Sequence, residues 1–384
     1  MTQKRIIVAA PNTFKGSLEA PAAAAAIARG VEAVFPEKEA RQLPLADGGD
    51  GTTDCIVRAT GGRLFHKTVT GPLGDPVEGT WGLTGDGATA VVEVASASGM
   101  ARISREKLDP MRATSYGTGE LIAAALESGC ERLFLGLGGS ATNDAGAGIL
   151  QALGVGLFDE EGRPLQPGGA GLERLSKISP ERLLPRLREV ELIPGFDVEN
   201  LLFGPAGAAY TYAAQKGASP EQLAPLDRGL RRFAAVVEKE LGVQVGSMPG
   251  GGAAGGIGAG LAGVLGAKLV SGAVEIMKIV GLPALLESGR VDLVITGEGE
   301  INLQTLYGKV PAGVARLAKR CGVPVLVLTG AIRLGLEEAQ REGITTMLAI
   351  ADGPLTLDQS MARTAELLEE TARRAMALLR RGPV

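Results

Sequence analysis

The chain has 384 residues, a length that suggests two domains rather than one. Its formal net charge of −4 at pH 7, with both signs interspersed, argues against a nucleic-acid partner or an anionic membrane. Glycine accounts for 57 residues, roughly twice its average usage, yet it follows no three-residue period, and 45% of the residues are hydrophobic. These values argue against a collagen-like or a disordered chain and indicate a globular protein with many tight turns.

The rarity of cysteine and histidine limits the chemistry. The three cysteines have no close spacing and leave one unpaired in any disulfide scheme, so we expect reduced thiols and a cytoplasmic protein. The apolar run after Lys4 is too short for a signal peptide, and the small-residue segment 250–266 falls short of a membrane span. His66 is the only histidine, which excludes the common zinc sites and predicts a surface or sheet-edge residue. Acid–base chemistry therefore has to rest on carboxylates, lysines or hydroxyls.

The N-terminal segment alternates predicted strands and helices. In chain order we expect a buried strand at 4–10, a loop at 11–17, an alanine-rich helix at 20–35, a strand at 42–45, a loop at 46–52 and a helix through residue 56. This order predicts a parallel sheet with functional loops at the carboxyl ends of its strands.

A different pattern follows. Segments 64–69, 77–83 and 88–95 alternate and are separated by Gly- and Pro-containing turns, which predicts an antiparallel meander. After residue 290 the parallel pattern resumes, with strands at 291–296, 323–328 and 347–350, helices at 311–320 and 336–341, and a final helix from residue 361. We therefore predict an α/β protein in which a parallel Rossmann-like domain (1–70 plus 285–384) receives an inserted mixed-sheet α/β domain (71–284). The active site is expected in the cleft between them.

The segment 133–153 is the most informative. An apolar strand leads into Gly138-Gly139, and a helix is expected to begin at the polar residues that follow, namely Ser140, Thr142, Asn143 and Asp144. Unpaired N–H groups and the helix dipole at such a position favour an anion, and Asp144 could add a magnesium ligand. The alternative is an ordinary helix cap, but a cap needs one such residue rather than four, so we favour a site.

Three further loops follow predicted strands. Lys15 lies in the loop 12–17, Asp47 and Asp50 flank Gly48-Gly49, and Glu298 lies between glycines in 296–302. A solvated lysine and surface turns are the alternative interpretations. The repetition of polar, glycine-framed strand ends favours a site, and its oxygen-rich character suits Mg²⁺ with phosphates.

Two segments of the sequence partly match known phosphate-binding motifs. A Walker A sequence is excluded because Val310 follows Gly308-Lys309. The segment Gly250–Gly255 satisfies G-x-G-x-x-G, with Glu275 downstream, which keeps a dinucleotide-dependent oxidoreductase as an alternative. In a chain so rich in glycine, a flexible loop that opens a helix beside a phosphate is the better interpretation.

Taken together, these loops resemble the glycerate kinase family, in its type-1 class, over nearly the whole chain. The matching stretches are residues 10–18, 44–52, 136–144, 215–218, 251–256, 296–299 and 304–305. The resemblance implies a two-domain enzyme that uses ATP and Mg²⁺ to phosphorylate D-glycerate. Small molecules are then the expected partners, whereas the oligomeric state and the choice between 2- and 3-phosphoglycerate stay open.

The resemblance also implies roles for residues. Asp47 is our choice of base, Asp144 or Asp197 would hold Mg²⁺, and Lys15 would meet the glycerate carboxylate or the transferred phosphoryl group. The resemblance also implies a catalytic role for Asp197, together with Asp47 and Lys15. Glycines of two loops would cradle the nucleotide phosphates: Gly138, Gly139, Gly251, Gly252 and Gly255. The remaining candidates for substrate or nucleotide binding are Asn12, Ser17, Gly48, Gly49, Asp50, Ser140, Thr142, Asn143, Thr296 and Glu298.

The chain departs from the family pattern at several positions. Asn12 and Asn302 stand where the family usually has carboxylates, and Asp50 stands where it usually has Glu. Because either missing carboxylate could be an essential base, a catalytically silent, ligand-binding member of the family is a further alternative.

Overall fold

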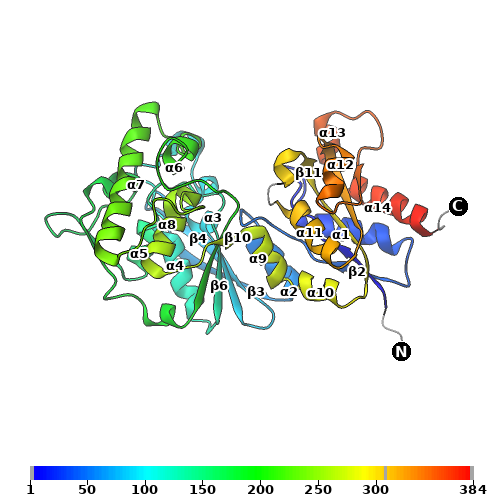
Figure 1. The fold of residues 1–384 in the computed structure, drawn as a ribbon, viewed down its shortest axis with the longest axis horizontal. Coiled ribbons are helices and arrows are strands. Elements are labelled where there is room, and N and C mark those ends of the chain that lie inside the picture. The colour runs from blue at the N-terminus through cyan, green and yellow to red at the C-terminus, as the bar shows by residue number, and fades with distance from the viewer. Residues whose placement is uncertain (1–3, 307–308, 381–384) are drawn as a thin grey trace. The chain divides into compact units, whose positions relative to one another are not determined.

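The computed structural model describes residues 4–306 and 309–380, and these residues form two compact units. The first unit comprises Met1–Asp47, Arg58–Thr60 and Ala273–Val384, and the second comprises Gly48–Val57 and Gly61–Gly272. In Figure 1 the blue N-terminal segment and the yellow-to-red C-terminal segment thus share one unit. This arrangement, with one α/β unit inserted into another, confirms the predicted fold class.

The first unit is built on a five-stranded, fully parallel sheet in the order β13-β12-β11-β1-β2. Its strands are β1 (Ile6–Ala9), β2 (Glu39–Gln42), β11 (Val291–Ile301), β12 (Val325–Ile332) and β13 (Thr346–Ala349). The central strand β1 is buried along its whole length, which explains its unbroken apolar sequence.

Helices cover this parallel sheet on both faces. The helices are α1 (Ala20–Glu32), α9 (Gly272–Ile279), α10 (Leu282–Glu287), α11 (Val310–Arg320), α12 (Leu336–Arg341), α13 (Leu357–Ala362) and α14 (Thr364–Arg380). Side chains of α1 and α14 form one cluster with Ile7 and Ala9 of β1. Ile6 and Val8 alternate with these residues and are equally buried, so they point to the opposite face, where α11 contacts β11 and β12.

Two strands of this sheet differ from the sequence prediction. β2 covers Glu39–Gln42 rather than 42–45, because it pairs in parallel with Ile6–Ala9 and the chain leaves the sheet where β1 ends. β11 continues to Ile301 instead of ending at 296, because Glu298, Glu300 and Ile301 pair with β12. The segment expected to be a loop is therefore the extended end of a strand.

The second unit contains a six-stranded mixed sheet in the order β10-β9-β6-β5-β4-β3. Its strands are β3 (Arg63–Thr70), β4 (Pro76–Leu83), β5 (Thr89–Glu93), β6 (Arg132–Gly136), β9 (Glu191–Phe196) and β10 (Val270–Ser271), and β7 (Gly156–Phe158) pairs separately with β8 (Lys177–Ser179). β3, β4 and β5 form the predicted antiparallel meander, and His66 lies exposed on the edge strand β3, as expected. The remaining pairs are parallel.

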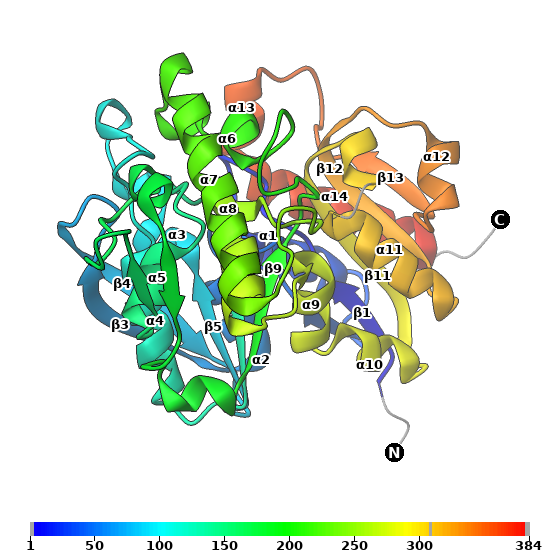
Figure 2. The same ribbon diagram turned by 60° about the vertical axis from the view of Figure 1, so that its left-hand side comes forward.

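The helices of the second unit lie around two apolar clusters. They are α2 (Thr52–Thr60), α3 (Val94–Ser98), α4 (Tyr116–Leu126), α5 (Ala147–Ala152), α6 (Ala208–Tyr212), α7 (Pro220–Leu241) and α8 (Ala253–Leu265). One cluster joins α4 to the sheet through Leu121 and Ile122, and the other joins α7 to α8 through Phe233 and Ala259. Figure 2 shows α7 running beside α8.

The division into units differs from the domain limits that we predicted. Residues 61–70 belong to the second unit rather than the first, because β3 pairs with β4 along its whole length. Residues 273–284 belong to the first unit, where the side chain of Met277 packs against Gly313 of α11.

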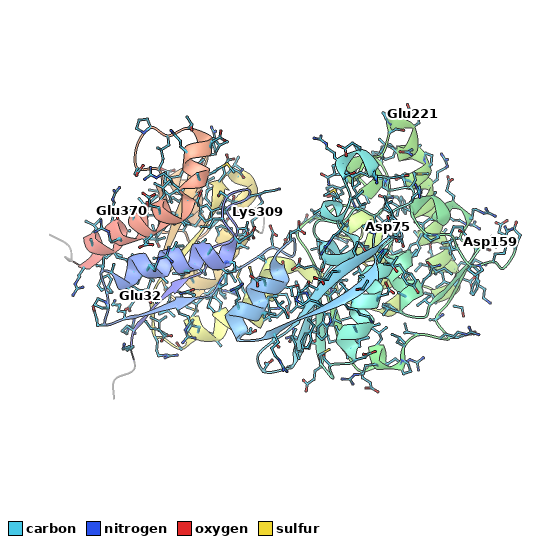
Figure 3. All side chains as sticks on the ribbon, turned by 180° about the vertical axis from the view of Figure 1, so that it is seen from behind. Glu32, Asp75, Asp159, Glu221, Lys309 and Glu370 are labelled. Atoms are coloured by element: carbon cyan, nitrogen blue, oxygen red, sulfur yellow. The ribbon has the colours of Figure 1, made fainter. Side chains whose placement is uncertain are left out.

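The cysteines, the apolar length of the helices and the charged side chains can also be compared with the sequence predictions. Among the described residues, Cys55, Cys130 and Cys321 form no disulfide bond. Over the described part of the chain, no helix is long and apolar enough to cross a membrane. Charged side chains such as Glu32 and Glu221 point outward from their helices (Figure 3).

Candidate active site

In the first unit, the ends of three strands meet at the carboxyl edge of the parallel sheet. The backbone N–H of Asn12 donates to the carbonyl of Gly297 (2.8 Å), and the N–H of Leu45 donates to the carbonyl of Pro11 (2.9 Å). The loops that follow β1 and β2 therefore lie beside the end of β11. This edge is where parallel α/β sheets usually bind ligands.

Two carboxylates interact at this edge. Glu298 is buried and accepts a hydrogen bond from Thr305 Oγ1 (2.7 Å). Burial raises the pKa of Glu298, and the charges of Asp47 and Glu300 raise this pKa further, whereas the Thr305 bond and the charge of Lys309 lower it. The half-buried Asp47 is thus an electrostatic neighbour of Glu298, although 250 residues lie between them in the sequence. Like charges at such a site favour retention of a proton by one partner.

Lysines and amides complete this edge. Lys15 is exposed, and the half-buried Lys309 stands just before α11 (Figure 3). Asn12 is buried and its Oδ1 accepts from the N–H of Thr13, while Asn302 Nδ2 donates to Glu300 Oε1 (3.0 Å). Gly308, the glycine of the Gly308-Lys309 pair that was compared with the Walker A motif, lies outside the described residues.

Two hydroxyl groups that we predicted to bind a ligand donate hydrogen bonds to backbone carbonyls of the protein. Thr296 is fully buried and its Oγ1 donates to the carbonyl of Ala10 (2.7 Å), so it ties β11 to β1. Ser17 Oγ donates to the carbonyl of Phe14 (3.0 Å) within its own loop. Both hydroxyl protons are therefore used by the protein in this structure.

In the second unit, the two glycine pairs of the motifs pack against each other. A Cβ on Gly138 would lie 2.5 Å from Gly49 Cα, and a Cβ on Gly136 would lie 2.5 Å from the carbonyl oxygen of Gly48. The N–H of Gly138 donates to that same Gly48 carbonyl (3.0 Å). We expected Gly138 to leave room for a phosphate, but the space is occupied by protein backbone, so the prediction that its N–H binds phosphate is withdrawn.

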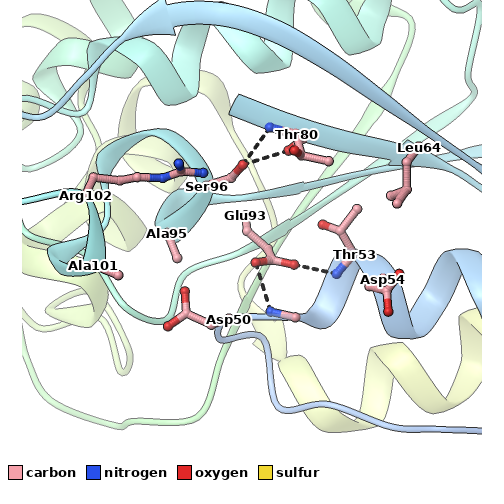
Figure 4. Close-up of a pocket in the computed structure, with 11 residues that line it drawn as sticks. Asp50, Thr53, Asp54, Leu64, Thr80, Glu93, Ala95, Ser96, Ala101 and Arg102 are labelled. Carbon is pink, nitrogen blue, oxygen red and sulfur yellow. Dashed lines mark hydrogen bonds between the residues drawn. The ribbon is translucent and has the colours of Figure 1, made fainter. Parts of the chain in front are cut away.

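Asp50 lines a pocket beside this contact. The pocket has a volume of about 370 Å³, and Figure 4 shows Asp50, Ser96 and Arg102 among the side chains around it. A Cβ on Gly139 would lie 3.3 Å from Asp50 Oδ1, so Gly139 lies next to one of the side chains that line the pocket. Asp50 of the loop at 46–52 thus connects the pocket with the Gly138-Gly139 turn.

Glu93 stands at the end of β5 and holds the first turn of α2. Its carboxylate accepts from the backbone N–H groups of Gly51 (3.2 Å) and Thr53 (2.5 Å), as the dashed lines in Figure 4 show. Burial raises the pKa of Glu93, and the hydrogen bonds from Thr53 and Gly51 oppose that effect. Glu93 therefore positions the loop that carries Asp50.

Asp144 accepts hydrogen bonds from several groups of the protein near the start of α5. It is fully buried, and its oxygens accept from Ser115 N–H (2.9 Å), Ser115 Oγ (2.8 Å), Gly146 N–H (3.1 Å) and Gly148 N–H (3.2 Å). Burial raises its pKa, and these bonds counteract that effect. The helix begins at Ala147 with Gly146 as its N-cap, so Asp144 lies two residues before the cap, and its assignment to Mg²⁺ stays a prediction.

The residues just before Asp144 have a different environment. Lys216, in a short 3₁₀ helix at Ala214–Lys216, is buried and donates from Nζ to Ser140 Oγ (2.8 Å) and to the carbonyl of Thr142 (2.7 Å). Burial lowers the pKa of Lys216 from its ordinary 10.5 to about 7, although the charge of Asp144 opposes this change. Thr142 Oγ1 and both amide atoms of Asn143 are buried and make no hydrogen bond to any residue that the structure describes.

The loop at 250–256 packs on this segment. Ala254, Gly255 and Gly256 have positive φ and are not helical, and a Cβ on Gly255 would lie 2.0 Å from the Thr142 carbonyl oxygen. The N–H of Ala145 donates to the Gly255 carbonyl (3.1 Å). A Cβ on Gly252 would likewise meet the carbonyl of Leu201 at 2.3 Å, while Gly251 has more space. The group that lies close to the backbone of Gly252 and of Gly255 is therefore another part of the protein.

The predicted metal residues are not assembled into a cluster. Asp197 follows β9 and is exposed, whereas Asp144 is fully buried. Within residues 4–306 and 309–380, no three His, Cys, Asp or Glu side chains are grouped so as to hold a metal ion. A magnesium ion would therefore have to use one or two carboxylates together with substrate oxygens, which is its usual mode at phosphate sites.

Sequence analysis missed three residues of these sites. Lys216 lies in the motif 215–218 and Thr305 in the motif 304–305, so both could have been found by asking why each motif has a polar side chain there. Glu93 ends a strongly apolar run at a strand terminus, which is a usual position for a functional carboxylate.

The parallel sheet with carboxylates at its carboxyl edge, together with the inserted unit and its polar glycine-rich loops, defines an α/β protein with candidate ligand-binding loops at strand ends. The glycerate kinase family profile matches residues 7–380, and the chain belongs to this family.

Curated relatives and a solved structure agree with this assignment. The chain is 45% identical over 367 residues to a glycerate kinase of Halalkalibacterium halodurans, with 96% of each chain covered. It is 42% identical over 375 residues to glycerate 2-kinase of Escherichia coli K12, with 97% of each covered. A crystal structure assigned to glycerate kinase 2 from Salmonella typhimurium LT2 superimposes with a TM-score of 0.89 at 42% identity, covering 99% of both chains.

Proposed function

We propose that the protein is a glycerate kinase, which transfers the terminal phosphoryl group of ATP to a hydroxyl of D-glycerate. The observation that carries this proposal is the similarity of the whole chain, and not of one domain, to glycerate kinases of several bacteria. The carboxylates and lysines at the carboxyl edge of the parallel sheet supply suitable chemistry. Phosphoryl transfer depends mainly on positioning and on neutralisation of charge.

Asp47 is the proposed base. It follows β2 at the edge of the sheet, and Gly48-Gly49 after it let the chain turn sharply. The neighbouring Glu298 has a raised pKa, so at neutral pH a proton resides more readily on Glu298 than on an ordinary glutamate. Asp47 would accept the proton of the glycerate hydroxyl as the phosphoryl group is transferred.

Glu298 is the carboxylate at this edge proposed to hold Mg²⁺, while Asp47 keeps the role of base. Glu298 interacts electrostatically with Asp47, and Mg²⁺ usually takes one or two carboxylates and completes its shell with phosphates and water. When bound, the ion would neutralise charge on the phosphate oxygens. Asp197 stays a predicted alternative ligand and catalytic residue, and Lys15 is proposed to meet the substrate carboxylate or the phosphoryl group.

The second unit is proposed to hold the nucleotide through Thr142 and Asn143, beside which Ser140 accepts a hydrogen bond from Lys216. Thr142 and Asn143 have hydrogen-bonding atoms that the protein leaves unused among the described residues, which supports a polar ligand there. Asp50 lines the adjacent pocket and Gly139 lies next to Asp50, and both are proposed to contact substrate as well. The location of the active site between the two domains stays a prediction.

A coupled assay of ADP release by the purified protein tests the function. We expect ADP release that requires both D-glycerate and Mg²⁺, and phosphorus NMR of the product distinguishes 2- from 3-phosphoglycerate. Glycerate-independent ADP release, or none over a range of pH and divalent metals, would refute the proposal. The second result would favour the catalytically silent alternative, which Asn12 and Asn302 motivate.

The oxidoreductase alternative has little support. The segment Gly250–Gly255 does not link a strand to a regular helix, because Ala254, Gly255 and Gly256 are non-helical and pack on Thr142–Ala145. A dinucleotide fingerprint needs a strand, a tight turn and a helix N-terminus in succession. The curated relatives cited above are named as kinases, which also disfavours this alternative.

A further inference from the structure

Lys216 is a buried lysine whose contacts are made with one short segment. Its Nζ donates to the Ser140 side chain and to the Thr142 backbone carbonyl, and only 3% of the residue is exposed. Both acceptors lie on the connection between β6 and α5. A single side chain from a distant part of the chain thus holds two points of this connection.

A lysine at this buried position is energetically unfavourable. A buried ammonium loses its hydration, and the cost is recovered only if good hydrogen-bond acceptors surround it. Lys239 of α7, by contrast, keeps 71% of its side chain exposed. An apolar residue of similar volume would fill the Lys216 site without this cost, so packing alone does not account for the lysine.

The atoms beside the held segment point to a ligand. Thr142 Oγ1, Asn143 Oδ1 and Asn143 Nδ2 are buried and have no hydrogen-bond partner among the residues described. Buried polar atoms in folded proteins nearly always have a partner, so a bound group is expected to supply theirs. Thr142 is therefore held by its carbonyl while its hydroxyl stays available.

Other hydrogen bonds hold the two ends of the segment, and Gly255 packs against Thr142 at its centre. The N–H of Ala141 donates to the Ser98 carbonyl (2.9 Å), and the N–H of Ala145 donates to the Gly255 carbonyl (3.1 Å). Asp144 is fixed by Ser115, Gly146 and Gly148. Between Ala141 and Asp144, the bond from Lys216 to the Thr142 carbonyl is the described hydrogen bond that sets the peptide plane.

We propose that Lys216 is a positioning residue of the nucleotide site: its two hydrogen bonds orient Thr142 and Asn143 so that their side chains bind a phosphate group of ATP. This inference rests on the proposed kinase function. Lys216 acts through the segment that it holds rather than by touching the reacting atoms, since both of its hydrogen bonds are to protein.

Two variants and a control test the proposal. Lys216→Met removes both hydrogen bonds at nearly constant volume, and Ser140→Ala removes only one, leaving the bond to the Thr142 carbonyl. Lys239→Met removes the same charge from an exposed position of the same unit. For each protein we would measure kcat, the KM for ATP and for glycerate, the Kd for ADP by calorimetry, and the melting temperature.

We expect Lys216→Met to raise the KM for ATP and the Kd for ADP by at least about tenfold, the loss that corresponds to one charge-assisted hydrogen bond. The KM for glycerate should stay within about twofold, because the described contacts of Lys216 do not reach the glycerate residues proposed above. Ser140→Ala should show a smaller increase in the same direction, and Lys239→Met should match wild type.

Unchanged ATP and ADP affinity in folded Lys216→Met would overturn the inference, as would equal losses for ATP and glycerate. If Lys216→Met does not fold, Ser140→Ala decides, and unchanged nucleotide affinity in that variant refutes the proposal. A wild-type protein without glycerate-dependent ADP release would instead refute the proposed function. The ADP affinities would still test the role of Lys216 in that case.

Discussion

Replacing Gly138 by alanine tests whether backbone packing or ligand binding requires the glycine pair. The added Cβ would lie 2.5 Å from Gly49 Cα, 3.0 Å from Gly49 N and 3.1 Å from the Gly48 carbonyl oxygen. All three atoms belong to the backbone, so no side chain can rotate away. The segments have to move apart, which weakens the hydrogen bond from the Gly138 N–H to the Gly48 carbonyl.

The expected destabilisation follows from these contacts. Inserting a methyl group into a closely packed site costs about 1–3 kcal/mol, and the weakened hydrogen bond adds about 1 kcal/mol. Gly138 does not have a positive φ, so alanine suffers no left-handed strain there. Without the clash, Gly138→Ala would be neutral or stabilising, because alanine restricts the unfolded chain. The structure therefore predicts a loss of about 2–4 kcal/mol in the free energy of unfolding.

Gly87 and Gly139 provide matched controls. Both have a φ of +74°, but a Cβ on Gly87 would meet nothing within 4 Å, whereas one on Gly139 would meet Ala95 and Asp50. Gly87→Ala should cost only the left-handed strain of about 1–2 kcal/mol. Gly139→Ala should cost more than Gly87→Ala and should also reduce turnover, because it disturbs Asp50.

Urea denaturation followed by circular dichroism measures the stability of the three variants, and ADP release measures turnover. We expect Gly138→Ala to be destabilised more than Gly87→Ala and to lose activity, since the 138–144 segment is displaced. A Gly138→Ala variant as stable as wild type, or more stable, would refute the predicted backbone clash. Normal stability combined with lost nucleotide binding would restore the phosphate-cradle interpretation.

Further predictions concern three other sites. Asp47→Asn should lower turnover by about 10²–10⁴-fold with ADP affinity retained. Asn302→Asp should change turnover far less. If Asp47→Asn keeps near-normal turnover and Asn302→Asp raises turnover many-fold, the base lies at the end of β11 instead. Glu93→Gln should destabilise the protein by about 1–3 kcal/mol in thermal unfolding, because an amide nitrogen would face the Gly51 or Thr53 N–H; an unchanged melting temperature contradicts that role. Because the folded protein releases the Lys216 proton near pH 7 and the unfolded chain keeps it until about 10.5, the stability of wild type relative to Lys216→Met should rise between pH 7 and 10. The slope should be at most about 1.4 kcal/mol per pH unit, and a constant difference over this range would show that Lys216 does not titrate there.

Local patterns in the sequence were sufficient for much of the architecture. The unbroken apolar runs of β1 and β12 and the alternation in β3–β5 predicted the parallel and antiparallel sheets, because strand periodicity reports directly which faces are buried. The ordered motifs predicted the family, which the match over residues 7–380 confirms. The same motifs placed Asp47 and Glu298 at strand ends, and parallel pairing then brings such ends to one edge.

Strand limits needed the tertiary structure. β11 extends to Ile301 only because β12 offers it a partner, and β2 ends where the pairing with β1 ends. Polar and glycine residues at these positions are equally compatible with a loop, so periodicity could not decide. Pairing between strands distant in sequence decided it.

The roles of the glycine-rich loops also depended on long-range contacts. A glycine indicates that something approaches the backbone closely, but its sequence context does not say whether that is a ligand or another segment of the chain. At Gly138 it is Gly48-Gly49, and at Gly255 it is Thr142. Likewise, Asp144 and Lys216 are ordinary charged residues in the sequence. Only the fold buries them and surrounds the carboxylate of Asp144 with hydrogen-bond donors and the ammonium group of Lys216 with acceptors.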